Sequence, residues 1–228
     1  MSLDFLSPAS PGAPAARGPL ADAAAAAGAT FEERDGWSLP VSFGDPAAET
    51  AACRDAVGFA DVSHLTKLEL QGGVEALTGA LGSLTAGTAT NVGGAWHCPV
   101  RPGLALVLCG PEQGTAKRDA LARDGVRVCD VAGAWGALAI AGPQARELFA
   151  RFCALDLRDS ALPVHGFRPG SIARTPGYLL REAEDRFLML FGAAYGAYVW
   201  EVVADVAARL GGRPVGLAAL PATETARA

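Results

Sequence analysis

The chain has 228 residues, of which 50% are apolar, and carries a formal net charge of −5 at pH 7. This length and apolar content are sufficient for one large domain or two small ones with a hydrophobic core. The acidic balance, without clusters of Lys and Arg, excludes a nucleic-acid-binding surface, and no apolar run is long enough to span a membrane.

The first segment, residues 1–28, is rich in Ala, Pro and Gly and contains few large apolar side chains. Such a segment buries too little surface to offset the entropy cost of ordering it. We therefore expect a flexible arm, free or laid on a partner, in which the alanines of residues 21–27 form at most a turn or two of helix.

After Asp35-Gly36, which is a turn signal, a helix is predicted over residues 46–57. Residues 56–73 then combine a polar corner, formed by Asp61, Ser63 and His64, with a strand-like alternation that we expect to form an edge-exposed strand. The simplest interpretation of the corner is structural, with Asp61 and Ser63 bonding local backbone amides and His64 packed behind them.

The remaining elements of the first half follow from apolar spacing and turn residues. We expect a helix over residues 74–81, strands over 91–100 and 104–109, and a surface helix over 112–123.

The second half repeats the first at an offset of about 70 residues. Asp130-Val131 and the strand over 138–142 correspond to Asp61-Val62 and the strand that follows it. The repeat predicts an α+β fold with two related lobes, residues 29–129 and 130–220, and a tail of residues 221–228. The second lobe's expected elements are helices over 144–153 and 193–210 and strands over 171–174, 178–181, 186–191 and 214–220.

Two motifs carry a resemblance to a known family. The sequence GWSLPV at residues 36–41 is followed by Arg54, Gly58 and DVSHLTK at residues 61–67. This order resembles the aminomethyltransferase family, which includes the glycine-cleavage T-protein and relatives in the sarcosine oxidase complex. The resemblance implies two ferredoxin-like lobes, as in the folate-binding domain of the T-protein. The chain looks like a truncated form that lacks the C-terminal barrel, and most resembles the sarcosine oxidase gamma subunit.

The resemblance also places the family's acidic motif, a pair of carboxylates that activates the folate-borne amine, on residues 93–98. Here His97 and Cys98 stand in place of the two acids. A neutral imidazole can accept a proton but cannot balance a developing cation, so the inherited chemistry would be severely weakened. Either the two residues belong to an ordinary strand, or they form a repurposed site together with His64.

The same resemblance assigns the folate pocket to Asp61, Trp96, Cys109, Tyr178 and Leu188. Cys109, Leu188 and Leu220 match positions where the family has polar side chains that recognise the pterin ring. Each lost hydrogen bond would cost about 1–3 kcal/mol, so tetrahydrofolate should bind weakly. Glu182 or Glu184 could substitute if the hairpin turn that carries them folds inward.

These expectations favour a largely non-catalytic gamma-type subunit of a flavin-dependent amine-oxidising complex in one-carbon metabolism. Its partners would be flavoprotein subunits that carry FAD, and a small secondary amine or folate would occupy a shared site. The alternative is a stand-alone tetrahydrofolate-dependent aminomethyl- or methyltransferase-like enzyme that uses His97, Cys98 and His64.

The cysteines and the N-terminus bear on disulfide bonds, metal sites and localisation. The five cysteines are widely spaced and without a CxxC pair, which favours reduced thiols and no metal site. Since the N-terminus has no signal-peptide core, we expect a cytoplasmic protein without a membrane contact.

Overall fold

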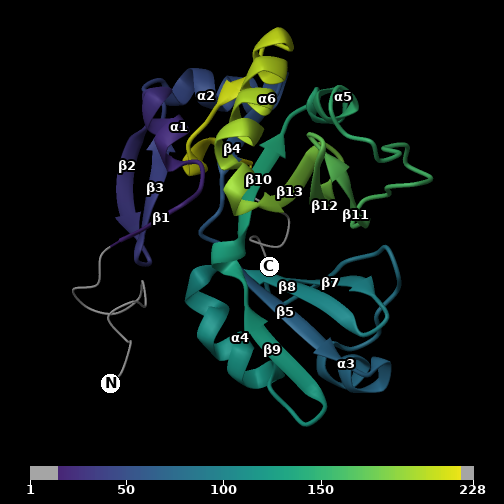
Figure 1. Cartoon of the computed structure of the whole chain (residues 1–228). Coiled ribbons are helices and arrows are strands. Elements are labelled where there is room, and N and C mark those ends of the chain that lie inside the picture. The colour runs from purple at the N-terminus through teal and green to yellow at the C-terminus, as the bar shows by residue number, and fades with distance from the viewer. Residues whose placement is uncertain (1–14, 222–228) are drawn as a thin grey trace.

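The structure is a computed structural model that describes residues 15–221 (Figure 1). One unit, which we call the small lobe, comprises residues 65–130 and holds a five-stranded antiparallel sheet of order β6-β7-β8-β5-β9. Its chain order β5-α3-β7-β8-α4-β9 is that of a ferredoxin-like lobe. The elements are β5 (Thr66–Gly72), α3 (Val74–Leu81), β6 (Thr90–Val92), β7 (Ala95–Arg101), β8 (Leu104–Cys109), the 3-10 turn η2 (Pro111–Gln113), α4 (Gly114–Leu121) and β9 (Val126–Asp130).

The second unit, the large lobe, contains a six-stranded sheet of order β11-β12-β13-β10-β4-β14. It repeats the arrangement of the small lobe through β10-α5-β12-β13-α6, with β4 beside β10 where β9 lies beside β5. The α+β class is therefore confirmed. The elements are β4 (Gly58–Asp61), the 3-10 turn η3 (Ala132–Ala134), β10 (Trp135–Ala141), α5 (Ala145–Ala150), β11 (Phe167–Ile172), β12 (Thr175–Ala183), β13 (Arg186–Gly192), the 3-10 turn η4 (Ala193–Tyr195), α6 (Gly196–Arg209), β14 (Arg213–Pro214) and the 3-10 turn η5 (Leu217–Ala219).

A three-stranded sheet of order β1-β3-β2 and two helices complete the large lobe. The structure differs here from the flexible arm expected for residues 1–28, because residues 15–28 are packed. Leu20 and Ala24 are fully buried against the core, so the leucine supplies the apolar anchor that an alanine run lacks. Residues 1–14 and the tail from residue 222 lie outside the described residues. The elements are β1 (Ala16–Arg17), α1 (Ala21–Ala26), β2 (Thr30–Arg34), β3 (Trp37–Ser42) and α2 (Pro46–Asp55).

The course of the chain between the lobes also differs from the expected division at residue 129. Strand β4 belongs to the sheet of the large lobe, so the chain leaves that lobe after β4 and returns to it at β10. Strand β5 is not an edge strand, since it pairs with both β8 and β9. The large lobe therefore consists of residues 15–64 and 131–221.

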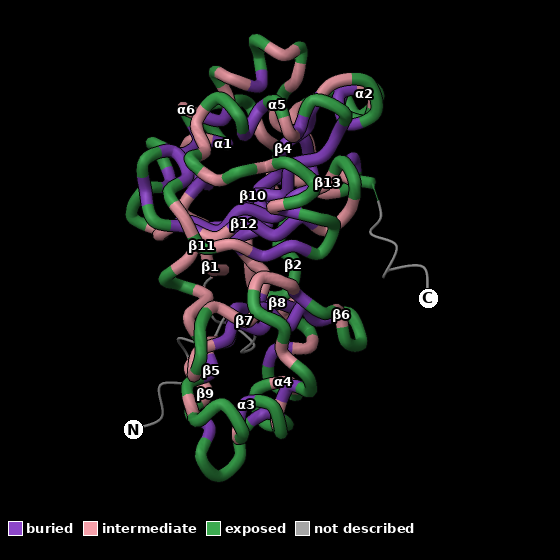
Figure 2. The backbone as a smooth tube through the Cα atoms, turned by 90° about the vertical axis from the view of Figure 1, so that its right-hand side faces the viewer, coloured by how far each residue is buried: buried purple, intermediate pink, exposed green. Residues whose placement is uncertain are grey.

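Alternation along the strands divides the core into layers. On β13, Phe187, Met189 and Phe191 pack under helices α1, α5 and α6, whereas Leu188 and Leu190 face the small lobe. On β8, Leu106 and Leu108 face the large lobe and the intervening residues pack against α3 and α4. The two sheets thus meet face to face with helices outside them, and Figure 2 shows β10 and β12 as buried strands.

Three expected strands are shorter, interrupted or displaced, each for a local reason. The strand over 91–100 is broken by Gly93 and Gly94, whose φ values of 58° and 79° form the turn between β6 and β7. The strand expected over 171–174 is displaced: β11 begins at Phe167 and ends at Ile172, because Ala173 and Arg174 occupy the left-handed turn between β11 and β12. The segment 214–220 contributes only the end of β14 and then the 3-10 turn η5.

Candidate functional site

A cavity of about 560 Å³ lies where the two lobes meet; we call it the interlobe cavity. The small lobe contributes the ends of β7 and β8 and the turn η2, and the large lobe contributes the β12–β13 hairpin and the C-terminal segment. Its lining residues are Val62, His64, Leu65, Asn91, Gly94, Trp96, Leu108, Cys109, Gly110, Glu112, Gln113, Ala139, Glu182, Arg186, Leu188, Leu217, Leu220 and Pro221.

A charged pair forms part of the wall contributed by the large lobe. Arg186 Nε donates to Glu182 Oε2 over 2.8 Å, and Trp96 Nε1 of the small lobe donates to Glu182 Oε1 over 3.1 Å. The Glu182 and Arg186 side chains are only 8% and 16% exposed. The carboxylate therefore bridges the two lobes, with each of its oxygens held by one donor.

The position of Glu182 follows from the hairpin. It lies two residues after Leu180, which packs in the core between the two sheets, at an irregularity in the pairing of β12 with β13. Because side chains two residues apart on a strand share a face, this spacing turns Glu182 to the same side as Leu180. The inward fold of this turn, raised as an alternative from the sequence, is thus observed for Glu182, whereas Glu184 pairs with Arg181 at 2.9 Å.

The polar corner that precedes β5 brings His64 to the cavity. Asp61 Oδ1 accepts from Ser63 N over 2.8 Å, and Ser63 Oγ accepts from Ala137 N over 3.0 Å. Buried Lys67 donates from Nζ to the carbonyls of Ser63 and Leu65 over 2.8 and 2.9 Å. These bonds fix the backbone on both sides of His64.

Burial shifts the pKa of Asp61, His64 and Lys67 in the direction that favours the uncharged form of each side chain. It raises the pKa of Asp61, and it lowers the pKa of Lys67 to about 8, against the opposing charges of Asp61 and Asp130. The pKa of His64 falls to about 4, through burial and then through the nearby charge of Lys67. The imidazole is therefore neutral at pH 7.

Two polar atoms among the lining residues are buried without a hydrogen-bond partner in the described part of the chain. They are Nδ1 of His64 and Oε1 of Gln113. Buried polar groups are almost always satisfied, so unpaired atoms in a cavity wall indicate a place where a ligand or an ordered water binds.

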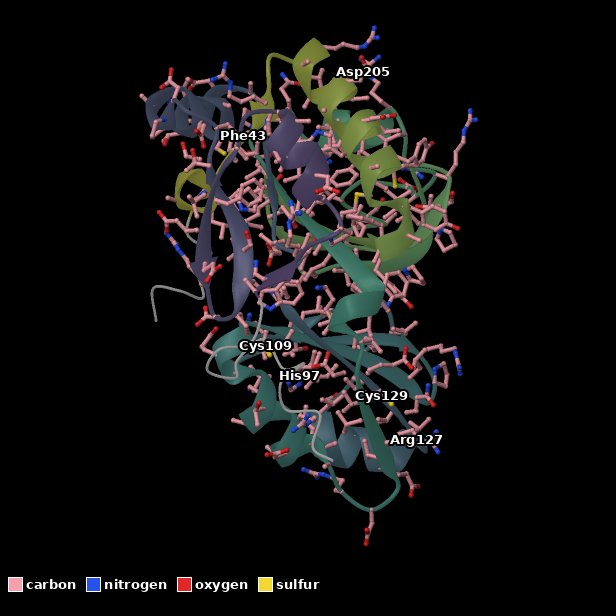
Figure 3. All side chains as sticks on the ribbon, turned by 60° about the vertical axis from the view of Figure 1, so that its left-hand side comes forward. Phe43, His97, Cys109, Arg127, Cys129 and Asp205 are labelled. Atoms are coloured by element: carbon pink, nitrogen blue, oxygen red, sulfur yellow. The ribbon has the colours of Figure 1, made fainter. Side chains whose placement is uncertain are left out.

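His97 and Cys98, which the resemblance matches to the family's acidic pair, are not among the lining residues of the interlobe cavity. His97 lies on the face of β7 that packs against α3, where Nδ1 is 3.1 Å from the Leu81 carbonyl oxygen. Cys98 is fully buried between the sheets, and this burial raises its pKa, so the thiol stays protonated. Figure 3 shows His97 among the side chains of the small lobe, below Cys109.

The residues assigned to the folate pocket are divided. Trp96, Cys109 and Leu188 line the cavity together with His64. Asp61 is 4% exposed within the polar corner and is not a lining residue. Tyr178 stacks on Phe167 with ring centroids 5.4 Å apart, outside the lining.

Sequence reasoning missed Asn91, Gln113 and Arg186, which also line the cavity. Asn91 precedes the turn at Gly93-Gly94, Gln113 lies between Gly110 and Gly114, and Arg186 is the first residue of β13. Polar residues beside turns and at strand ends are usually exposed, so the local sequence gives no sign that these three line a cavity. Among residues 15–221, no cluster of three or more His, Cys, Asp or Glu side chains is arranged to hold a metal ion. No helix in this range is long and apolar enough to cross a membrane.

Sequence comparison finds one family. The model described as the GCVT N-terminal domain matches residues 112–225. An aminomethyltransferase of Desulforamulus reducens is 29% identical over 238 residues, which cover 89% of this chain and 61% of that protein. An aminomethyltransferase of Saccharopolyspora erythraea is 29% identical over 224 residues, which cover 87% of this chain and 60% of that protein. The chain thus spans less than two thirds of the length of these curated relatives.

Two solved structures have the same fold. The glycine cleavage system aminomethyltransferase T from Bartonella henselae superposes with a TM-score of 0.74 at 20% identity, over 90% of this chain and 60% of that chain. A chain of the heterotetrameric sarcosine oxidase from Corynebacterium sp. U-96 superposes with a TM-score of 0.67 at 23% identity, over 88% of this chain and 99% of that chain.

Proposed function

Because this chain belongs to the GCVT N-terminal domain family, we propose that it is a gamma-type subunit of a sarcosine-oxidase-like complex that oxidises a small secondary amine. In this proposal the flavin belongs to partner subunits, and this subunit encloses part of the space in which the oxidised one-carbon unit is passed on. The subunit itself does not perform the transfer.

The observation that carries the proposal is the position of His97 and Cys98. One side chain faces helix α3 and the other is a buried, protonated thiol, so neither reaches the interlobe cavity. A transferase needs a charged group at the reacting amine, and these two residues cannot supply it. The match to 99% of one polypeptide of a heterotetrameric oxidase supports the choice of complex.

The positions that the resemblance assigns to the pterin ring offer few polar partners to tetrahydrofolate. Cys109, Leu188 and Leu220 line the wall with a thiol and two leucines. Glu182 already accepts one hydrogen bond on each oxygen, from Arg186 and from Trp96, so part of its accepting capacity is used within the protein. These positions therefore favour weak binding of tetrahydrofolate by this chain.

The experiment is purification of the tagged chain from its native host, followed by gel filtration and a visible spectrum. We expect elution well above the mass of 23.2 kDa, together with a flavoprotein, and amine-dependent formation of hydrogen peroxide by that fraction. Elution at the mass of a single chain, without flavin, would contradict the proposal.

A second function has one observation in its favour. The cavity keeps a carboxylate, a guanidinium and two unpaired polar atoms, which suit a stand-alone tetrahydrofolate-dependent aminomethyl- or methyltransferase-like enzyme. Titration of the isolated chain with tetrahydrofolate distinguishes the two functions. A dissociation constant below about 10 μM that rises at least tenfold in Glu182→Gln would favour the enzyme, whereas a subunit of the proposed kind should bind more weakly.

A further inference from the structure

A second cavity, of about 450 Å³, shares His64 with the interlobe cavity. We call it the hairpin cavity, because the tip of the β2–β3 hairpin forms one side of it. The opposite side consists of α4 and the segment that follows β9. Its lining residues are Ala16, Asp35, Trp37, His64, Thr66, Pro111, Gly114, Thr115, Arg118, Asp130, Ala132 and Gly133.

The hairpin cavity is lined by charges of both signs that do not neutralise one another. Arg118 comes from α4, Asp35 from the hairpin tip and Asp130 from the end of β9. Within residues 15–221, Asp35 and Asp130 form no ion pair, and Arg118 contacts only Asp119 at 3.5 Å. The cavity therefore offers a guanidinium and two carboxylates to a ligand.

The remaining lining residues supply polar groups and one aromatic surface. Thr66, Thr115 and the half-buried Trp37 are lining residues, so two hydroxyl-bearing side chains and an indole border the cavity. His64 adds a ring nitrogen, Nδ1, that is buried and has no hydrogen-bond partner among the described residues. An aromatic face beside carboxylates favours a cationic group, and a guanidinium favours a carboxylate.

We propose that the hairpin cavity binds a small zwitterion of the amino-acid class. Its carboxylate contacts Arg118 and Thr115, and its ammonium lies between Asp35 and Asp130 against Trp37. A simple anion meets the two aspartates there, and a simple cation meets Arg118, so each is held less tightly than a molecule that carries both charges. This site shares His64 with the interlobe cavity but no other lining residue, and the inference does not depend on the proposed function.

The test is calorimetric titration of the full chain with N-methylglycine, with acetate and methylammonium as probes that carry one charge each. We expect the dissociation constant of N-methylglycine to be at least about tenfold lower than that of either single-charge probe. Arg118→Ala and Asp35→Asn should each weaken the binding of N-methylglycine by about tenfold or more.

Asp35→Asn should not disturb the fold, and Lys117→Ala serves as a matched control. Asp35 has a φ of 51° and precedes Gly36 in the hairpin turn, and Asn is well accepted at such a position, so Asp35→Asn removes a charge without disturbing the fold. Lys117→Ala removes the positive charge next to Arg118 on the same helix but outside the lining, and should leave the affinity unchanged.

Three outcomes would overturn the inference. Equal affinity for acetate and N-methylglycine would indicate a simple anion site. The absence of saturable binding would show that the cavity holds only solvent. Binding that is lost in Glu182→Gln but kept in Arg118→Ala would place the zwitterion in the interlobe cavity instead. None of these results depends on whether a flavoprotein co-purifies with the chain.

Discussion

At the scale of single residues, Lys67 is an ammonium group without access to solvent. Its side chain is 0% exposed, and its Nζ donates to two main-chain carbonyls, a pattern that the neutral amine also satisfies. Burial lowers its pKa from 10.5 to about 8, so the folded chain releases this proton more readily than the unfolded chain does.

This shift predicts a rise in stability with pH. Between pH 8 and 10.5 the unfolded chain binds more protons at Lys67, so the free energy of unfolding contributed by this residue increases as pH rises. Across that window, wild type should gain about 3 kcal/mol relative to Lys67→Met, measured by urea unfolding at both ends. A constant difference between the two proteins would show that Lys67 keeps its ordinary pKa when folded.

The side chain of His97 shows the limit of sequence reasoning at this scale. Alternation predicts that His97 and Trp96 face opposite ways on β7, and they do. The alternation does not say which face meets the cavity, because both faces of this sheet are covered and both carry apolar residues. The resemblance already assigned Trp96 to the pocket, but the arrangement of the lobes was needed to exclude His97 from the cavity wall.

At the scale of elements, the carboxylate of Glu49 connects three segments. It is 2% exposed and accepts from Ser42 Oγ, Phe43 N and Gly216 N over 2.9, 2.7 and 2.7 Å. Helix α2 is thereby joined both to the end of β3 and to the C-terminal segment. Removal of the carboxylate would leave the buried amide of Gly216 and the partly buried amide of Phe43 without an acceptor.

We therefore expect Glu49→Ala to lower the free energy of unfolding by about 2–4 kcal/mol in urea denaturation. Thr50→Ala, an exposed position on the same helix, serves as the matched control and should change the free energy by about 0.5 kcal/mol or less. Similar effects of the two substitutions would mean that Glu49 does not connect these segments in solution.

Helix α1 provides a second test at this scale. Leu20 is 0% exposed and precedes a helix of small side chains that reaches α6. Leu20→Ala should cost about 2–5 kcal/mol of unfolding free energy, as for other buried leucines. Asp22→Ala, in the exposed ion pair with Arg17, should cost about 1 kcal/mol or less. A negligible effect of Leu20→Ala would restore the expectation of a loose arm over residues 15–28.

Local sequence patterns predict some of these elements correctly and miss others that depend on tertiary packing. Helix α2 begins where Asp45-Pro46 predicts, and the Asp45 side chain accepts from Ala48 N over 3.0 Å. The packed state of residues 15–28 was missed because it depends on one buried leucine and on the long-range pairing of β1 with β3. The position of β4 in the other lobe's sheet is a long-range pairing that no local pattern reports.

At the scale of the whole molecule, the two lobes share a core. Residues of both sheets, among them Trp96, Leu106, Leu188 and Leu190, form one buried cluster between the lobes. Unfolding one lobe alone would expose this apolar surface on the other. The lobes should therefore unfold together as a single cooperative unit.

This cooperativity can be measured with two probes. Trp96 is the tryptophan of the small lobe, and far-UV circular dichroism reports both lobes. We expect the urea transitions followed by tryptophan fluorescence and by circular dichroism to coincide, and Leu190→Ala to shift both midpoints together. Separate midpoints, or a shift confined to one probe, would show two independently stable lobes.

The two crossings between the lobes lie side by side. Val62 N donates to the Ala137 carbonyl over 3.0 Å, and Val131 N donates to the Lys67 carbonyl over 2.8 Å. The chain thus departs from one sheet and re-enters it at the neighbouring strand, so that residues 65–130 resemble a long excursion between two paired strands. Evolution could exchange or reshape that excursion, and with it half of each cavity wall, while the strands at its base kept their register.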